Sequence, residues 1–85
     1  MKQLIPDTMR LDTEKKKISV ILPTLNECDN VQLMYDALMI EFRASSMDYE
    51  IIFVDDNSSD GTIDRVRALS SMDDNVKYLL MSKRF

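Results

Sequence analysis

The sequence contains no histidine, so the commonest general base and metal ligand of enzymes is missing. Catalysis by a serine–histidine or cysteine–histidine pair is therefore excluded. The single cysteine, Cys28, cannot form an internal disulfide, which fits a reducing compartment. One glycine and two prolines are too few for the many tight turns of an all-β sandwich.

Long apolar runs are also absent. No uninterrupted apolar stretch approaches the ~20 residues that a membrane-spanning helix needs. Residues 1–17 carry scattered charges and lack the apolar stretch of a secretory signal. We therefore expect no transmembrane segment and a cytoplasmic location, with peripheral attachment to a membrane left open. A formal net charge of −4 argues against a nucleic-acid partner, because a phosphate backbone favours a basic surface.

The composition that remains is that of a small globular domain. Of the 85 residues, 45% are hydrophobic and 31% are charged, which lies in the ordinary range of soluble domains. Residues 1–17 are polar and aperiodic, and they are predicted to form a flexible N-terminal arm. Residues 18–85 are predicted to form one folded unit.

Three short apolar runs predict β-strands, at residues 18–22, 49–54 and 76–81. Each is nearly continuous in apolar residues, the pattern of a strand that is buried on both faces. Pro23 is expected to end the first strand.

Two helices are predicted between these strands. Residues 26–30 offer several N-cap side chains, residues 44–46 are expected to end the first helix, and residues 70–75 are expected to form a turn after the second. Apolar residues at helical spacing form one stripe in each helix: Val31, Met34, Tyr35, Leu38 and Phe42 in the first, and Ile63, Val66 and Leu69 in the second.

The resulting β-α-β-α-β order has connections too long for hairpins, so the strands are predicted to be parallel. The expected fold class is α/β, as half of a doubly wound, three-layer sheet. Ligands of such sheets bind at the carboxyl ends of the strands, beside helix N-termini.

Two polar clusters follow the first two strands, at residues 23–27 and 55–58. Neighbouring parallel strands bring them to one edge, so Glu27, Asp55 and Asp56 are expected to converge there. Such a group suits a nucleobase N–H, ribose hydroxyls or a divalent cation. Asp and Asn after a strand are also ordinary helix caps, and Asp60 or Thr62 is expected to be one. The two clusters together favour a binding site, because caps do not require a doubled aspartate at a strand end.

These clusters carry a specific resemblance. Residues 18–27, ISVILPTLNE, resemble the first-strand signature of family 2 glycosyltransferases, a hydrophobic strand followed by Pro-Thr-Tyr-Asn-Glu. Residues 53–62, FVDDNSSDGT, resemble the family's second signature, and residues 81–85, MSKRF, are similar to the segment after its third strand. The closest branch resembles the transferases that use polyprenyl or dolichol phosphate as acceptor. The resemblance implies a partial Rossmann-like nucleotide-sugar-binding domain of GT-A type over residues 18–85.

The resemblance also implies roles for individual residues. Pro23, Thr24 and Leu25 would line the base and ribose of a UDP- or GDP-sugar, and Glu27 would contact the nucleoside. Asp56 matches the aspartate that accepts a hydrogen bond from the base, with Asp55 supporting the loop. Leu25 stands where tyrosine is commoner, which would remove aromatic stacking against the base, ~1–3 kcal/mol.

The family's Asp-x-Asp motif, which binds the metal and the diphosphate, is absent from the sequence. Its near match at residues 48–50 lies at the entry of the second strand, the wrong end of the sheet. No catalytic or metal-binding residue is therefore predicted, and this segment alone is expected to bind no cofactor, although the complete family enzyme would use Mg²⁺ or Mn²⁺.

The prediction is the N-terminal nucleotide-sugar-binding segment of a family 2 glycosyltransferase, inactive alone. Its expected partners are a UDP- or GDP-sugar and, through an open sheet edge, a second copy or a companion chain. The alternative is a non-catalytic nucleotide- or protein-binding module of the same fold. A receiver-like signalling domain is disfavoured, because the first strand ends in Pro23 rather than in an acid pair and no aspartate directly follows the third.

Overall fold

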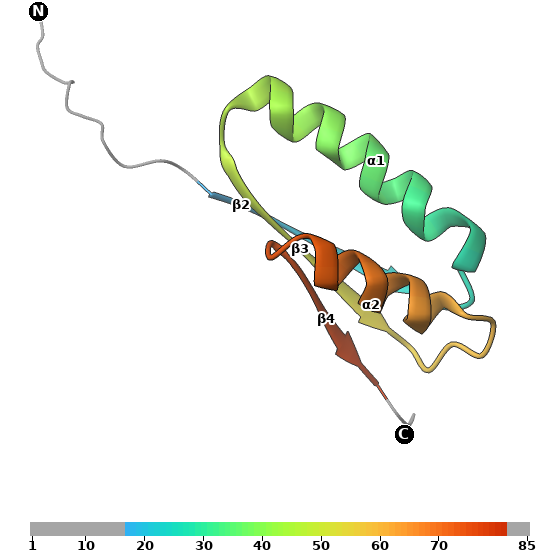
Figure 1. The fold of residues 1–85 in the computed structure, drawn as a ribbon. Helices are drawn as coiled ribbons and strands as arrows, with labels where there is room; N and C mark the ends of the chain where they lie inside the picture. Colours follow the sequence, from blue (N-terminus) through green and yellow to red (C-terminus); the bar gives the residue numbers. More distant parts are fainter. Residues whose placement is uncertain (1–16, 82–85) are drawn as a thin grey trace, which may run out of the picture.

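The computed structural model describes residues 17–81, in which three strands and two helices alternate (Figure 1). The elements are β2 (Lys17–Thr24), α1 (Cys28–Ser45), β3 (Asp48–Asp55), α2 (Thr62–Met72) and β4 (Val76–Leu80). The predicted β-α-β-α-β order is confirmed. Lys17 belongs to β2 rather than to the arm. The rest of the predicted arm, residues 1–16, and residues 82–85 lie outside the described residues.

The three strands form one parallel sheet in the order β2-β3-β4. Thr24 at the end of β2 is in register with Asp55 at the end of β3, and Asp55 is in register with Leu80 at the end of β4. All three strands therefore end at the same edge of the sheet. The loops that follow β2 and β3 begin at this edge (Figure 1).

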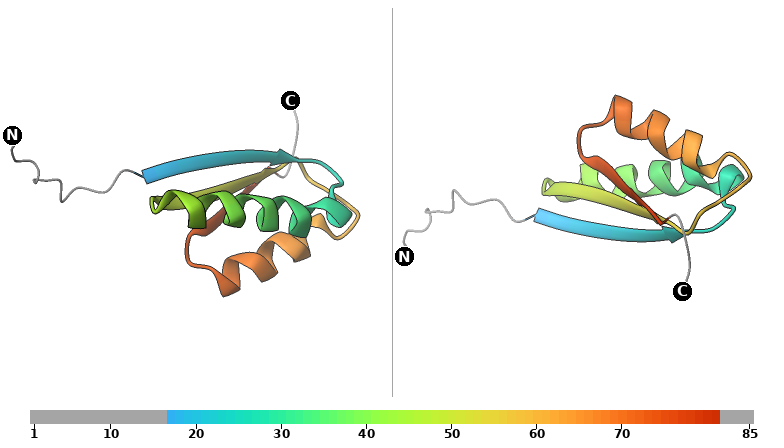
Figure 2. Two further views of the ribbon diagram at one scale, coloured as in Figure 1. Left: turned by 90° about the horizontal axis from the view of Figure 1, so that it is seen from above. Right: turned by 90° about the horizontal axis from the view of Figure 1, so that it is seen from below.

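Both helices cover one face of the sheet (Figure 2). The α/β class and the parallel sheet of a Rossmann-like half are confirmed. Of the three layers expected, residues 17–81 form two, because α1 and α2 lie on the same side.

The core lies between this face and the two helices. Fully or almost fully buried side chains are contributed by α1 (Val31, Phe42), β3 (Ile51, Phe53), α2 (Val66, Leu69) and β4 (Val76). The predicted stripe of α1 is confirmed, since Met34, Tyr35 and Leu38 are partly buried against the same cluster. In the stripe of α2, Val66 and Leu69 are buried and Ile63 is half-buried.

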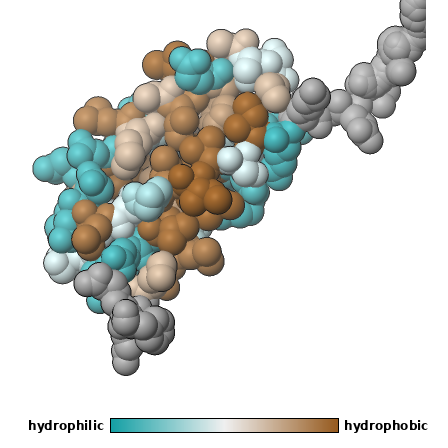
Figure 3. All heavy atoms as spheres, turned by 180° about the vertical axis from the view of Figure 1, so that it is seen from behind, coloured by the Kyte–Doolittle hydropathy of each residue, from teal (hydrophilic) through white to brown (hydrophobic). Residues whose placement is uncertain are grey.

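The expectation that the strands are buried on both faces is wrong for the described residues. Burial alternates along β2, and Ile21 on the uncovered face is 63% exposed. Leu79 on β4 is 61% exposed. The reason is topological: both helices lie on one side, so every second side chain of each strand points to the open face, which carries an apolar patch (Figure 3).

Pro23 does not end the first strand, which continues to Thr24. The Thr24 carbonyl accepts the Asp56 N–H at 2.9 Å, so Thr24 directs its backbone groups toward β3. Pro23, one residue earlier, directs its backbone toward the free edge of β2, where its missing N–H breaks no bond to β3. Proline is therefore compatible with this strand because β2 is an edge strand among the described residues.

The predicted turn at residues 70–75 is shorter than expected, because α2 continues to Met72. The Ser70 hydroxyl donates to the Val76 carbonyl at 2.8 Å, and the Ser71 hydroxyl donates to the Ala68 carbonyl at 2.8 Å. Ser70 thus connects the end of α2 to the start of β4, whereas Ser71 bonds back to a carbonyl of its own helix in the last turn.

Candidate functional site

The candidate site lies at the carboxyl edge of the sheet, where two loops run side by side. We call Leu25–Glu27 the first loop and residues 56–61 the second loop. Hydrogen bonds join them directly: the Asn26 N–H donates to Ser58 Oγ at 2.8 Å, and the Ser59 N–H donates to Asn26 Oδ1 at 2.9 Å. The predicted meeting of the two polar clusters at one edge is thus present.

Asp55 lies beneath this meeting point with none of its surface exposed. Its Oδ1 accepts the hydroxyls of Thr24 and Ser58, both at 2.7 Å, and its Oδ2 accepts the Ser58 N–H at 2.8 Å. Burial raises the pKa of the Asp55 carboxyl, but the hydrogen bonds from Ser58 and Thr24 outweigh burial and lower it overall. Asp55 is therefore a charged internal support for the second loop, and a ligand cannot reach it in this arrangement.

Thr24 is almost fully buried, and its hydroxyl is directed to Asp55 rather than outward. It joins β2 to β3 at the base of the site. Asp56, which directly follows Asp55, is half-buried at the start of the second loop, and its N–H donates to the Thr24 carbonyl. The doubled aspartate thus has two different environments, one fully internal and one at the rim.

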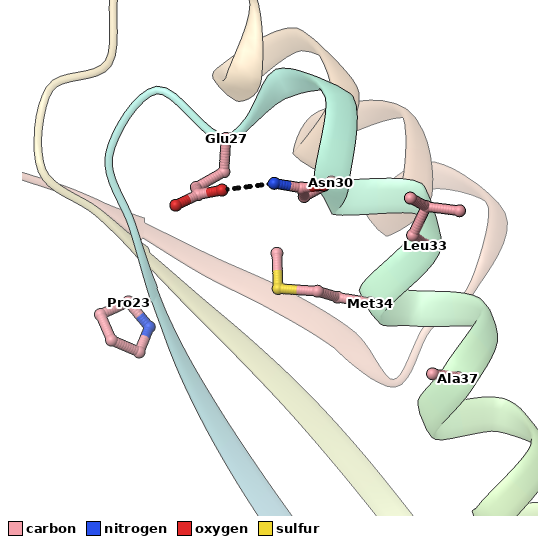
Figure 4. Close-up of a pocket in the computed structure, with 6 residues that line it drawn as sticks. All are labelled: Pro23, Glu27, Asn30, Leu33, Met34 and Ala37. Carbon is pink, nitrogen blue, oxygen red and sulfur yellow. Dashed lines mark hydrogen bonds between the residues drawn. The ribbon is translucent and has the colours of Figure 1, made fainter.

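Beside the first loop, a cavity of about 380 Å³ opens between the end of β2 and the first half of α1 (Figure 4). Glu27 lies at its polar end, where Glu27 Oε1 accepts the Asn30 side-chain amide at 2.8 Å. Met34 projects from α1 toward the strand that carries Pro23 (Figure 4). The wall is mostly apolar, and it is formed by Pro23, Glu27, Asn30, Leu33, Met34 and Ala37.

Of the six predicted site residues, Pro23 and Glu27 line this cavity. Thr24 and Asp55 lie together beneath the loops, as described above. Leu25 is 52% exposed on the first loop, and neither it nor Asp56 lines the cavity.

Sequence reasoning missed the α1 part of the cavity wall. The sequence pattern assigns Met34 to the core stripe and Asn30 to the cap candidates. Leu33 provided a signal in the sequence, because it is apolar yet lies outside the stripe that faces the core. In the structure its side chain is 64% exposed.

Asp60 connects the starts of both helices. Its Oδ1 accepts the N–H and the hydroxyl of Thr62, and its Oδ2 accepts the Cys28 N–H at 3.1 Å. The hydrogen bond from the Thr62 hydroxyl is the main cause that lowers the pKa of Asp60. Burial acts in the opposite direction, and the backbone bonds from Cys28 and Thr62 lower the pKa further. The prediction that Asp60 or Thr62 is the N-cap of α2 is wrong, because the N-cap is Gly61 and no side chain caps the helix from that position. Asp60 instead accepts the N–H of Thr62, the first residue of α2, from one position further out.

A comparison of sequences assigns the chain to a family. The pattern that defines glycosyl transferase family 2 matches residues 19–85, which include both loops and the whole sheet after its first two residues. The chain belongs to glycosyl transferase family 2.

Several named proteins are similar to this chain over part of its length. A protein of Bacillus subtilis named as a glycosyltransferase, CsbB, is 40% identical over 68 residues, or 80% of this chain and 21% of the relative. The dolichol-phosphate mannosyltransferase of Pyrococcus furiosus is 40% identical over 55 residues, 65% of this chain and 15% of the relative. The undecaprenyl-phosphate 4-deoxy-4-formamido-L-arabinose transferase of Yersinia pestis is 28% identical over 78 residues, 91% of this chain and 24% of the relative. The chain thus spans about a fifth of the length of these relatives.

The described part of this family 2 chain does not fit a divalent cation. Within residues 17–81, no three His, Cys, Asp or Glu side chains are grouped closely enough to hold a metal ion. Both carboxylate oxygens of Asp55 accept hydrogen bonds from Thr24 or Ser58. Asp55 therefore does not join Glu27 and Asp56 as a cation ligand in this arrangement. No helix in the described range is long and apolar enough to cross a membrane.

Proposed function

We propose that this chain is the nucleotide-sugar-binding opening segment of a family 2 glycosyltransferase that transfers a sugar from a UDP- or GDP-sugar to a polyprenyl phosphate. The single observation that carries the proposal is the pair of hydrogen-bonded loops at the carboxyl edge of the sheet. They hold one rim aspartate, Asp56, and one cavity carboxylate, Glu27, on neighbouring strand ends. The acceptor class is supported by two relatives named for dolichol phosphate and undecaprenyl phosphate.

The chemistry of the site suits a nucleoside more than a phosphate. Carboxylates accept hydrogen bonds from base N–H groups and ribose hydroxyls, and each such charge-assisted bond contributes about 1.5–3 kcal/mol. The N–H groups of Glu27 and Cys28 at the start of α1 already donate to Thr62 and Asp60. These donors are therefore not open to an anion, in contrast to the phosphate-binding helix starts of many α/β folds. Pro23 and Leu25 provide apolar surface beside them.

The roles we propose follow this division. Asp56 accepts a hydrogen bond from the base, Glu27 contacts the nucleoside, and Pro23 and Leu25 border the base and ribose. Buried Thr24 and Asp55 support the loops from within. The metal ion and the groups that act on the diphosphate and the acceptor are not assigned to this segment. The chain alone is therefore expected to bind nucleotide without transferring sugar.

Isothermal titration of the chain with UDP and with GDP tests this proposal. We expect saturable binding of one nucleotide, and a roughly ten- to hundred-fold weaker Kd for Asp56→Asn and for Glu27→Gln, because each loses a charge-assisted bond. Glu41→Gln is the matched control, since Glu41 lies exposed on α1 away from the cavity. The absence of heat with both nucleotides, or equal weakening by the control, would contradict the proposal. In a separate assay with a UDP- or GDP-sugar and a polyprenyl phosphate, release of free or transferred sugar by the chain alone would contradict its inactive character.

A further inference from the structure

Two relays of the same design connect the loops. In each, a backbone N–H of the first loop donates to a hydroxyl near the second loop, and that hydroxyl donates to an aspartate. In one, the Asn26 N–H donates to Ser58 Oγ at 2.8 Å and Ser58 Oγ donates to Asp55 Oδ1 at 2.7 Å. In the other, the Glu27 N–H donates to Thr62 Oγ1 at 2.9 Å and Thr62 Oγ1 donates to Asp60 Oδ1.

The middle hydroxyl gains strength from this arrangement. A hydroxyl whose proton is held by a carboxylate has a more negative oxygen, so it is a better acceptor for the backbone N–H behind it. It is also fixed in one rotamer, since both its proton and its lone pair are in use. Thr62 has no exposed surface, so water does not compete for its hydroxyl. Each relay therefore holds the backbone of the first loop at a defined distance from the second.

Asn26 is attached to the second loop at two points. Its N–H is part of the first relay, and its side-chain Oδ1 accepts the Ser59 N–H at 2.9 Å. Its backbone is left-handed, with φ of 53°, a conformation that asparagine adopts more readily than most residues. Leu25 and Glu27 flank it on either side. The orientation of both neighbours thus depends on how Asn26 is held.

We propose that Asn26, Ser58 and Thr62 are positioning residues of the nucleotide site. Through the two relays they set the first loop, with Leu25 and Glu27, against the second loop, with Asp56. None of the three contacts the nucleotide in this assignment. The inference rests on the proposed function and adds the residues that determine the shape of its site.

The relays differ from ordinary helix capping in one respect. α1 receives no hydrogen bond from a capping side chain of its own, and its first N–H groups are satisfied by Thr62 and Asp60 of the other connection. A purely stabilising cap would change the melting temperature and leave the affinity of the folded protein unchanged. A positioning relay changes the affinity of molecules that are still fully folded.

Three variants separate these roles. Thr62→Val removes the hydroxyl with little change of shape, Thr62→Ser retains the hydroxyl, and Ser58→Ala interrupts the other relay. Ser70→Ala is the matched control, because it also deletes a partly buried hydroxyl bond, to the Val76 carbonyl, but away from the loops. The Kd for UDP and GDP is measured by calorimetry well below each melting temperature, and hydrogen exchange of the Asn26 and Glu27 amides is measured by NMR.

We expect Thr62→Val and Ser58→Ala to weaken nucleotide binding roughly five- to ten-fold, the equivalent of one lost hydrogen bond. Thr62→Ser should restore affinity to within about two-fold on the same basis. Exchange of the Glu27 amide should accelerate in Thr62→Val and not in Ser58→Ala, with the reverse for the Asn26 amide. Ser70→Ala should lower the melting temperature and leave both amides and the Kd unchanged.

If the wild-type chain binds nucleotide and both Thr62→Val and Ser58→Ala have the same Kd as the wild type, the positioning role is contradicted and the proposed function is not. Failure of the wild-type chain to bind either nucleotide removes the proposed function and the site that the relays would shape. If Thr62→Val does not fold, Ser58→Ala and Thr62→Ser still test the proposal. An unchanged Kd in Ser58→Ala contradicts it. So does a loss of nucleotide affinity in Thr62→Ser as large as the loss in Ser58→Ala.

Discussion

At the residue scale, one aspartate far from the loops joins three parts of the fold. Asp73 Oδ2 accepts the hydroxyls of Tyr35 at 2.8 Å and Tyr49 at 2.7 Å, and its Oδ1 accepts the Asn75 N–H at 2.9 Å. These residues come from α1, β3 and the turn before β4. The Tyr49 ring also stacks on Phe42, with centroids 4.5 Å apart. The cluster closes the end of the molecule opposite the candidate site.

This cluster predicts a dependence of stability on alkaline pH. Burial, followed by the hydrogen bond to Asp73, raises the pKa of Tyr35 to about 12. A phenol whose pKa is higher in the folded state stabilises the fold fully below its ordinary pKa of about 10, and this stabilisation is lost as pH rises through the folded value. Urea unfolding between neutral pH and about pH 12 should show that loss, and tyrosinate absorbance should show a late-ionising group.

Burial and the hydrogen bond to Asp73 also raise the pKa of Tyr49. Tyr35→Phe should therefore remove one of two late-ionising phenols and reduce the loss of stability, whereas Tyr78→Phe is the matched control and should leave both phenols in place. The prediction is contradicted if all tyrosines ionise in a single step near the ordinary pKa of about 10 and the stability is unchanged above that pH. The cluster would then not exist in solution as the structure has it.

Sequence reasoning could reach some residue roles and not others. The burial of Asp55 was not predicted, although strand parity accounts for it: Asp55 stands two residues after Phe53 and four after Ile51 on β3, so it faces the helices with them. The hydrogen bonds that the Ser58 and Thr62 hydroxyls accept from the first loop did not follow from local pattern. They depend on the register of β2 against β3, which joins residues more than thirty positions apart.

At the scale of elements, strong periodicity predicted the helices well. The stripe of α1 and its end near Ser46 were correct, because apolar spacing and cap residues point to the same structure. The apolar character of the strands was misleading about burial. The apolar pattern of a strand indicates which side chains can be buried. Which of them are buried within residues 17–81 depends on the helices, and both helices cover the same face of the sheet.

The end of α1 provides a prediction at this scale. Its C-cap, Ser46, has left-handed backbone angles, φ of 60° and ψ of 24°, a position that glycine usually fills. Ser46→Gly removes the Cβ strain, about 1–2 kcal/mol for a left-handed residue, and part of that gain is offset by a more flexible unfolded chain. We expect a net gain of up to about 1 kcal/mol, visible as a melting temperature several degrees higher.

Ala44→Gly provides the matched comparison two residues earlier, at a helical position of α1. There glycine gains nothing and should cost about 0.5–1 kcal/mol through backbone entropy. The two substitutions therefore shift the melting temperature in opposite directions. A loss of stability in Ser46→Gly would show that the left-handed cap does not form.

At the scale of the whole molecule, one face of the sheet is uncovered within residues 17–81, and both of its edge strands, β2 and β4, have only β3 as a neighbouring strand. The open face carries Ile21 and Leu79, both more than 60% exposed, and an apolar patch covers much of it (Figure 3). The β2 edge has no neighbouring strand, and only Pro23 withholds a donor along it. Polar side chains on this face include Glu50 with Lys17, Lys77 and Ser19, at the other end of the strands.

An unpaired strand edge next to exposed apolar side chains favours pairing with another chain, and a second copy is always available in a purified sample. We therefore predict that the chain self-associates at micromolar concentration, as measured by sedimentation velocity. Ile21→Lys places a charge on the edge strand and should shift the distribution toward monomer. Met72→Lys is the matched control, because Met72 is 78% exposed on α2, outside the sheet, and should leave association unchanged. A wild-type chain that sediments as a single monomeric species across this range would contradict the prediction.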